Sequence, residues 1–160
     1  MGGPVSTTTF SVDIRATGEL SAVAAIKRTK QKMNNIRPWY KKLARAIAAA
    51  QLLNFTTEGS LAGGWAPLSP EYAAWRLVHA PGPIMVRTGH LMLSLTSERE
   101  LVKSMTNRSM TLGSDVAYAH FHQTGTSHMP QRKVLVLPES VMKAMLKDLA
   151  KYVVEGRLES

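Results

Sequence analysis

Cysteine is absent from the 160 residues of this chain. Disulfides, thiolate metal sites and cysteine nucleophiles are therefore excluded. No apolar run approaches the ~20 residues that a membrane-spanning helix needs. The start, Met1-Gly2-Gly3-Pro4, is not followed by the apolar core of a signal peptide. We therefore expect a soluble protein that is made in the cytoplasm and has no contact with a membrane.

The motifs of common enzyme classes are also missing. Gly113-Ser114-Asp115 lacks the second glycine of a serine-nucleophile turn. The glycine-rich stretch 59–64 lacks the Lys-Ser/Thr pair of a phosphate-binding loop. The eleven acidic residues are scattered, and Glu98 and Glu100 fit a charged turn better than a catalytic pair. The sequence thus predicts no enzymatic activity, no catalytic residue and no cofactor.

Acidic residues are scarcest where basic ones gather. The chain has a net charge of +9, and no acid occurs between Leu20 and Thr57. Helical surfaces that need only solubility usually mix charges of both signs, because opposite pairs one turn apart stabilise a helix. We therefore interpret the basic stretch as a surface that meets nucleic acid or an acidic partner, and a merely solvated surface is the alternative. The candidate residues are Lys27, Arg28, Lys30, Lys41, Lys42 and Arg45.

Composition and periodicity predict one folded domain over 1–160 with helices at both ends. Hydrophobic residues make up 44% of the chain and charged residues 19%, which is typical of globular proteins. Apolar residues at helical spacing predict a basic helical region over 19–56, either as two helices at about 19–34 and 38–56 or as one helix kinked at Pro38. Ser69 can cap a short helix over Glu71–Val78. A final helix spans 138–155, with its inward side formed by Val141, Met142, Met145, Leu146, Leu149 and Val153.

Strand patterns occupy the rest of the chain. A flexible arm covers 1–9, and alternation from Thr8 to Ile14 predicts a half-buried strand. Residues 84–137 read as a β-rich core, with a hairpin formed by 101–106 and 109–113 and a short strand at 134–137. Two segments are open to both readings, since 89–95 and 116–123 fit either a strand or a short helix. The expected fold class is α+β, with the N-terminal helical hairpin and the C-terminal helix packed on a small, mostly antiparallel sheet.

Three histidines lie close together in the sequence, at His120, His122 and His128. Zinc accepts imidazole ligands but needs three or four on a fixed frame. In a strand His120 and His122 would share a face, whereas in a helix they would point about 200° apart. We predict no metal site and interpret the three as hydrogen-bonded or interface histidines. Trp65, Tyr72 and Trp75 are likewise interpreted as core or interface anchors.

Five short motifs follow one another between residues 54 and 137. They are Asn54-Phe55 with Gly63-Gly64-Trp65-Ala66-Pro67-Leu68-Ser69-Pro70, Arg87-Thr88-Gly89-His90-Leu91-Met92-Leu93-Ser94, Leu112-Gly113, Tyr118-Ala119-His120-Phe121-His122-Gln123-Thr124-Gly125, and Pro130-Gln131-Arg132. Their order resembles the virion-morphogenesis, or tail-completion, family of Mu-like and P2-like tailed bacteriophages. One departure from the family is Gln131-Arg132-Lys133-Val134, where relatives often have an aromatic residue after the basic one.

The resemblance implies a structural neck or tail-end protein of the virion. Related proteins form rings, commonly of six subunits, at the head-proximal end of the tail, where they contact connector or stopper proteins and the tail tube. It implies a hexameric homo-oligomer, with genomic DNA in the lumen as a further partner of the basic surface. The candidate interface residues are Trp65, Tyr118, His122, Gln123, His128 and Arg132. A sequence-nonspecific nucleic-acid-binding module is the alternative function.

Overall fold

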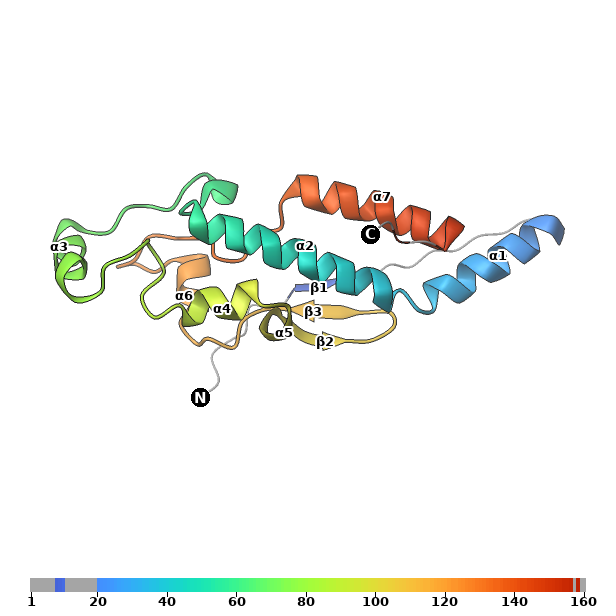
Figure 1. The fold of residues 1–160 in the computed structure, drawn as a ribbon, viewed down its shortest axis with the longest axis horizontal. Helices are drawn as coiled ribbons and strands as arrows, with labels where there is room; N and C mark the ends of the chain where they lie inside the picture. Colours follow the sequence, from blue (N-terminus) through green and yellow to red (C-terminus); the bar gives the residue numbers. More distant parts are fainter. Residues whose placement is uncertain (1–7, 11–19, 157, 159–160) are drawn as a thin grey trace.

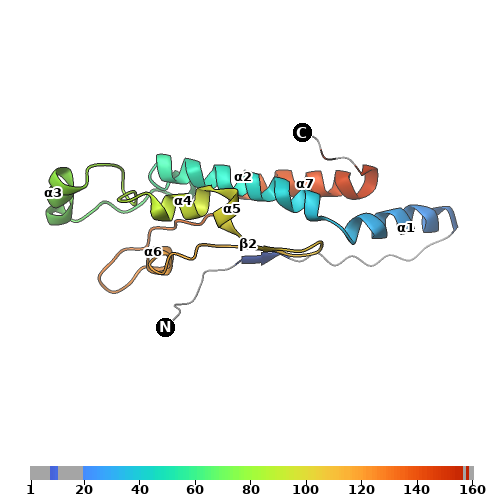
Figure 2. The same ribbon diagram turned by 60° about the horizontal axis from the view of Figure 1, so that its bottom comes forward.

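A long central helix organises the fold. The computed structural model describes residues 8–10, 20–156 and 158. The elements are β1 (Thr8–Phe10), α1 (Leu20–Met33), α2 (Arg37–Thr56), the 3₁₀ turn η1 (Ser60–Ala62), α3 (Pro70–His79), α4 (His90–Thr96), α5 (Glu98–Leu101), β2 (Val102–Met105), β3 (Met110–Leu112), α6 (Ala119–Thr124) and α7 (Glu139–Glu155). Helix α7 runs beside α2 on one side, and α4, α5 and the sheet lie on the other (Figure 1). Helices α1 and α3 lie at opposite ends of the molecule in both views (Figure 2).

Local sequence signals explain where the helices begin and end. Pro38 lies in the first turn of α2, where its missing N–H costs no hydrogen bond. Ser69 caps α3, because its Oγ accepts a hydrogen bond from the Tyr72 N–H at 3.4 Å. Gly156 ends α7 with a φ of 77°. The helices predicted at 19–34, 38–56, 71–78 and 138–155 are therefore confirmed, with small shifts at their ends.

The sheet has three antiparallel strands in the order β1-β3-β2. Strands β2 and β3 form the predicted hairpin, whose turn is closed by a hydrogen bond from Thr106 N to Ser109 O of 2.8 Å. β1 pairs with β3 so that Thr9 lies opposite Thr111. The predicted α+β class is confirmed. The strand predicted over 8–14 is present at Thr8–Phe10, and residues 11–14 and most of the predicted arm lie outside the described residues.

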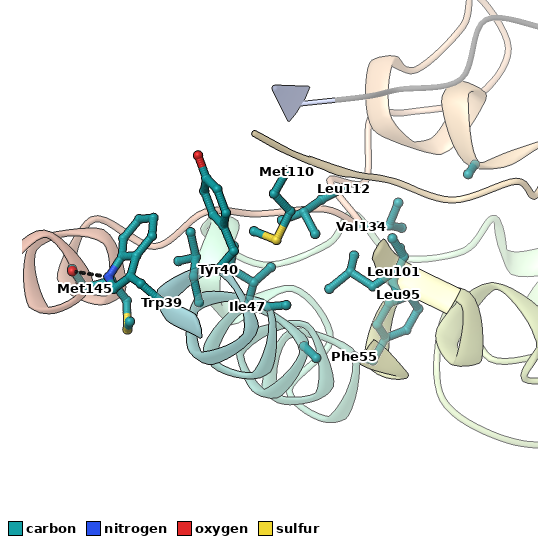
Figure 3. Packing of buried hydrophobic residues seen from close by; sticks show 14 of the residues in the cluster. Trp39, Tyr40, Ile47, Phe55, Leu95, Leu101, Met110, Leu112, Val134 and Met145 are labelled. Carbon is teal, nitrogen blue, oxygen red and sulfur yellow. Dashed lines mark hydrogen bonds between the residues drawn. The ribbon is translucent and has the colours of Figure 1, made fainter. Parts of the chain in front are cut away.

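The core is formed where α2 packs between these layers. Buried α2 side chains meet apolar residues of α4, α5, the hairpin, the segment after Arg132 and α7 (Figure 3). The α2 residues are Trp39, Tyr40, Leu43, Ile47 and Phe55, and the residues that they meet include Leu95, Leu101, Met110, Leu112, Val134 and Met145. The Trp39 indole Nε1 donates to Met145 O at 2.8 Å, which ties α7 to α2. Leu146, predicted to face inward, is instead 52% exposed. It lies about 100° around the helix from Met145, and that rotation turns it towards solvent.

The region 84–137 contains fewer strands than its pattern predicts. Only β2 and β3 are strands within it. The helical reading is the correct one for both ambiguous segments, because α4 covers 90–96 and α6 covers 119–124. The predicted strand at 134–137 is wrong, since these residues pair with no strand and the chain bends at Leu135.

Side-chain amides take the place of a neighbouring strand along residues 134–136. Gln123 of α6 accepts hydrogen bonds from Val134 N and Leu135 N, both at 3.0 Å, and donates to Leu135 O at 3.0 Å. Gln51 of α2 accepts from Val136 N at 2.9 Å and donates to Val136 O at 2.6 Å. Buried backbone groups need such partners. The apolar run therefore indicates correctly that this segment is buried. Its backbone hydrogen bonds, however, are made by two glutamine side chains and not by a neighbouring strand.

Lys133 extends the same arrangement by one residue. Its carbonyl accepts from Asn54 Nδ2 at 3.0 Å and from Trp65 Nε1 at 2.9 Å. Gln51 and Asn54 are both fully buried one turn apart on α2, so one face of that helix is dedicated to this segment. We call residues 133–136 the amide-bound segment.

We predict that Gln51→Met destabilises the protein by roughly 2–4 kcal/mol. Methionine keeps the length of the side chain but leaves the N–H and C=O of Val136 without partners, and a buried unpaired group costs about 1–3 kcal/mol. The matched control is Gln31→Met on the exposed surface of α1. Urea unfolding followed by circular dichroism measures both, and equal midpoints for the two variants would contradict the assigned role of Gln51.

Candidate functional site

A cavity of about 750 Å³ lies between α3, α4, α6 and the loops beside them. Four separate parts of the chain line it, and they carry Leu68 and Ser69, the stretch 85–91, Tyr118 with His122, and the loop 128–132. Three arginines and three histidines face it, and among the described residues no aspartate or glutamate does. We call it the cationic cavity, defined by Arg76, Arg87, Arg132, His90, His122 and His128.

Arg132 fastens two walls of the cavity together. Its side chain is 5% exposed and donates from Nε to Ala66 O and from Nη2 to Pro67 O, both at 2.8 Å. Its backbone N–H donates to His122 O at 2.8 Å. Burial lowers the pKa of Arg132 from its ordinary value, yet a guanidinium remains charged at neutral pH. Its partners here are neutral carbonyls, so its charge is not cancelled.

Arg76 also lines the cavity and is likewise held by backbone carbonyls. It is the buried residue of α3, and its guanidinium donates to Ala80 O at 3.1 Å and to Pro83 O and Val86 O at 3.0 Å each. Three carbonyls of one loop thus converge on one side chain. Among the residues that the structure describes, no carboxylate forms an ion pair with Arg76 or Arg132.

An aromatic stack lies beside the cavity on α3. Tyr72 and Trp75 are parallel with ring centroids 5.8 Å apart, and Trp75 and His79 are parallel at 4.7 Å. The Arg87 guanidinium carbon lies 5.6 Å from the centre of the Trp75 ring, within the range of a cation–π contact. Arg87 is exposed, so this contact positions a solvent-accessible charge at the rim.

His122 lies on α6 against Arg132. Its ring meets Tyr118 edge to face at a centroid distance of 6.0 Å, and its Nδ1 is buried with no hydrogen-bond partner among the described residues. Burial lowers the pKa of His122 below its ordinary value of 6.5, and the charge of Arg132 lowers it further. His122 is therefore neutral at pH 7, and the fixed positive charge of the cavity comes from the arginines.

One glycine in the loop that carries His128 cannot be replaced without strain. Gly125 has a φ of 75°, and a Cβ there would lie 2.9 Å from Gln131 N and 3.2 Å from Met129 O. The chain can therefore turn back from α6 towards Arg132 only if residue 125 lacks a side chain. This requirement gives a physical reason for the Gln-Thr-Gly ending of the Tyr118–Gly125 motif.

The residues predicted as an interface divide into two groups. Tyr118, His122, His128 and Arg132 line the cationic cavity. Trp65 and Gln123 lie beneath it, where Trp65 packs on Phe55 with ring centroids 5.3 Å apart and both bind the amide-bound segment. Trp75 and Tyr72 are 40% and 42% exposed, which fits the interface reading better than the core reading.

The predicted basic surface is not uniform in space. Lys42 Nζ lies 3.1 Å from Asp148 of α7, and Arg45 Nε lies 3.1 Å from Glu98 of α5. The acid-free stretch of sequence therefore meets acids from distant segments. Lys27, Arg28 and Lys30 on α1 and Lys41 on α2 are exposed, and none of them forms an ion pair with a described residue.

Sequence reasoning did not single out Arg76, Arg87 and His90 as site residues. Arg87 and His90 belong to the Arg87–Ser94 motif, so position within a motif was the available signal. Arg76 offered a different signal, because it is the single arginine of a mostly apolar helix that is followed by a Pro-Gly-Pro loop. Only the folded chain shows that this loop turns three carbonyls towards it.

Neither a metal-binding cluster nor a membrane-spanning helix occurs in the described part of the chain. No group of three His, Asp or Glu side chains there could hold a metal ion, and His120, His122 and His128 form no such group. Within the same residues, no helix has the length and apolar character needed to cross a membrane.

Comparison with known proteins gives one match. The model of a family described as the phage virion morphogenesis family matches residues 19–153, which is most of the chain. No curated protein and no solved structure matches the chain. The matched range includes every motif segment that lines the cationic cavity.

We predict that His122 makes the protein less stable in acid. A histidine whose pKa is lowered on folding binds a proton more readily in the unfolded chain, so its contribution is complete above about pH 6.5 and declines as pH falls below that value. His122→Gln removes this contribution. Melting temperatures measured at pH 7.5 and pH 5.5 at one ionic strength should fall further for the wild type than for the variant, and an equal fall would refute the assignment.

Proposed function

The chain belongs to the phage virion morphogenesis family, and from that premise we propose that it is a tail-completion or tail-terminator protein that forms a ring at the head-proximal end of the tail. Membership makes the chain a structural protein of the phage virion, and the ring, its position and its partners are our proposal. Those partners are other copies of the chain, the connector or stopper above the ring and the tail tube below it. Its location is then the neck of the virion.

The observation that carries this proposal is the convergence of four motif segments on one cavity. A motif residue that served only the core would have no reason to face an open cavity, yet Leu68, Thr88, Tyr118 and Arg132 all line it. Loops held on a rigid frame are where proteins most often place their contacts. A shaped surface with no catalytic constellation fits an assembly protein.

Helix α3 supports self-association through a surface of a different kind. It projects at one end of the molecule, away from α2 and α7 (Figure 1). Leu77 and Val78 are 76% and 77% exposed there, next to Tyr72 and Trp75. Clustered exposed apolar side chains mark interaction surfaces. We assign α3 to the contact between neighbouring subunits of the ring.

Composition and images of virions test the proposal directly. Mass spectrometry of purified virions should detect the protein in a few copies per particle, and negative-stain images of the purified protein should show closed rings. A phage with this gene disrupted should accumulate filled heads and tails that do not join. Absence of the protein from purified virions would overturn the proposal.

We predict that Val78→Glu prevents ring formation without unfolding the subunit. The Val78 side chain is exposed, so a charge there is tolerated in the monomer but is costly in an apolar contact. Val154→Glu on α7 is the matched control, because Val154 is 75% exposed and also lies near a helix end. Native mass spectrometry should show monomers for the first variant and rings for the second. The same oligomer in both would remove α3 from the subunit contact.

Helix α1 supports a second function, which is contact with DNA in the lumen. Lys27, Arg28 and Lys30 are exposed and lie at the end of the molecule opposite α3. A contact of this kind neutralises phosphates regardless of sequence and weakens steeply with salt. The same residues would carry the alternative function of a nucleic-acid-binding module.

We predict that the combined reversal Lys27→Glu, Arg28→Glu and Lys30→Glu weakens binding to duplex DNA and makes it less salt-dependent. The slope of log K against log salt should fall by roughly 0.9 for each cation that contacts a phosphate. The control combines Lys133→Glu, Lys143→Glu and Lys147→Glu, three exposed lysines elsewhere. Equal losses in both triple variants would show that only net charge matters and that α1 is a solvated surface.

A further inference from the structure

We propose that the cationic cavity is a docking site for an acidic segment of another protein, which inserts a glutamate or aspartate side chain flanked by apolar residues. This inference rests on the proposed function, because a neighbouring virion protein is the partner that such a site would join. It adds the chemistry of that partner and the residues that bind it. Charge, the apolar lining and the shape of the cavity support it.

The charge of the cavity is positive and uncompensated. Arg76, Arg87 and Arg132 face it, and among the described residues no acidic side chain lines it and no carboxylate pairs with any of the three. Hydrogen bonds to backbone carbonyls use three of the five N–H donors of Arg76 and two of those of Arg132. Buried charges are normally paired, because removing them from water is costly. An incoming carboxylate supplies the missing counter-charge.

The electrostatic state of His122 agrees with this reading. Burial, and then the charge of Arg132, hold the pKa of His122 below its ordinary value, and the buried Nδ1 has no partner among the described residues. An acidic neighbour would raise the pKa of this histidine, and no described acidic residue does so.

The apolar part of the lining specifies what accompanies the carboxylate. Leu68, Met85, Leu91 and Met129 line the same cavity as the arginines, and Tyr72 and Tyr118 add aromatic rings. Methionine adapts its shape to varied partners. A small free anion would leave this surface uncovered, whereas a peptide with leucine or phenylalanine beside an acid would cover it.

The shape of the site favours a peptide over nucleic acid. A duplex presents its phosphates on a convex surface, which cannot reach the guanidinium groups buried in the walls of the cavity. Arg76 and Arg132 are each only 5% exposed, so only a slender group reaches them. The exposed cations of α1, at the opposite end of the molecule, suit a duplex better.

A second copy of the chain is a less suitable occupant. The chain carries an excess of nine positive charges, and several of its acids are already engaged. Asp148, Glu98, Asp115 and Glu139 form ion pairs within the subunit, and Glu58 Oε1 accepts from Ile84 N at 2.9 Å. A different, acidic protein complements the cavity better.

Methionine methyl groups provide a readout inside the site. In protein labelled with ¹³C at methionine methyls, Met85 and Met129 report on the cavity, whereas Met110 and Met145 are buried in the core. The probe is an acetylated and amidated peptide that alternates leucine with glutamate. Its matched control has glutamine in place of each glutamate. Titration of the acidic peptide should shift Met85 and Met129 saturably and leave Met110 and Met145 in place, and the glutamine peptide should bind at least tenfold more weakly.

A charge-reversal variant then connects binding to the cavity. Arg87→Glu should weaken binding of the acidic peptide at least tenfold, because the exposed Arg87 contributes to the site but makes no buried hydrogen bond. The control Arg99→Glu makes the same charge change on α5, away from the cavity, and should alter affinity less than twofold. Equal effects of the two variants, or equal binding of the two peptides, would overturn the inference.

Two further outcomes would assign the site to another occupant and also overturn the inference. In one, a 12-base-pair DNA duplex shifts Met85 and Met129 and competes with the peptide. In the other, dilution of the protein alone moves the same two resonances, which identifies a second copy. The titration uses the isolated chain and is independent of virion composition. Failure of peptide binding with intact ring formation removes only this inference, and failure of ring formation with intact peptide binding removes only the proposed function.

Discussion

The backbone of residues 133–136 needs hydrogen-bond partners in a place where no strand is available, and the rest of the structure depends on how that need is met. Gln51 and Asn54 supply partners from α2, Gln123 supplies them from α6, and Trp65 adds one from the loop before α3. Helix α2, helix α6 and the loop before α3 are thereby all fixed to the amide-bound segment. Because Arg132 directly precedes that stretch, its guanidinium is placed against Ala66 and Pro67 with little freedom. The geometry of the cationic cavity follows from this arrangement.

The two buried arginines are held in place by hydrogen bonds, but no carboxylate of the described residues neutralises their charge. A guanidinium held by a carboxylate would be equally well fixed, but its field would be cancelled. Here carbonyl oxygens orient Arg76 and Arg132 while leaving each with a full positive charge. Such an arrangement costs stability, since an unpaired buried charge is unfavourable. Proteins commonly accept such costs at functional sites, and the surrounding hydrogen bonds show where the compensating energy comes from.

Much of the fold could be read from the sequence because helix periodicity and end signals are local. Pro38, Ser69 and Gly156 act within one turn of their own positions, and the helices they bound were predicted well. The strand at 134–137 was predicted wrongly, since an apolar run reports burial but not the identity of its hydrogen-bond partners. The same distinction between local signals and contacts made only in the folded chain applies to the site. The motifs containing Tyr118, His122 and Arg132 were recognisable, whereas Arg76 gained its role only when a loop folded around it. The basic stretch looked free of acids because Asp148 and Glu98 approach it only in three dimensions.

The separation of α3 and α1 gives the subunit a direction. One end presents aromatic and aliphatic side chains, and the other presents lysine and arginine. A two-fold dimer must place like patches together, which would set cations against cations if it formed through α1. A head-to-tail contact avoids this conflict, because each subunit then offers its neighbour a different surface from the one it uses itself. Any assembly built in that way has two chemically distinct faces. Different partners can then each recognise one face, which allows them to be added in a fixed order.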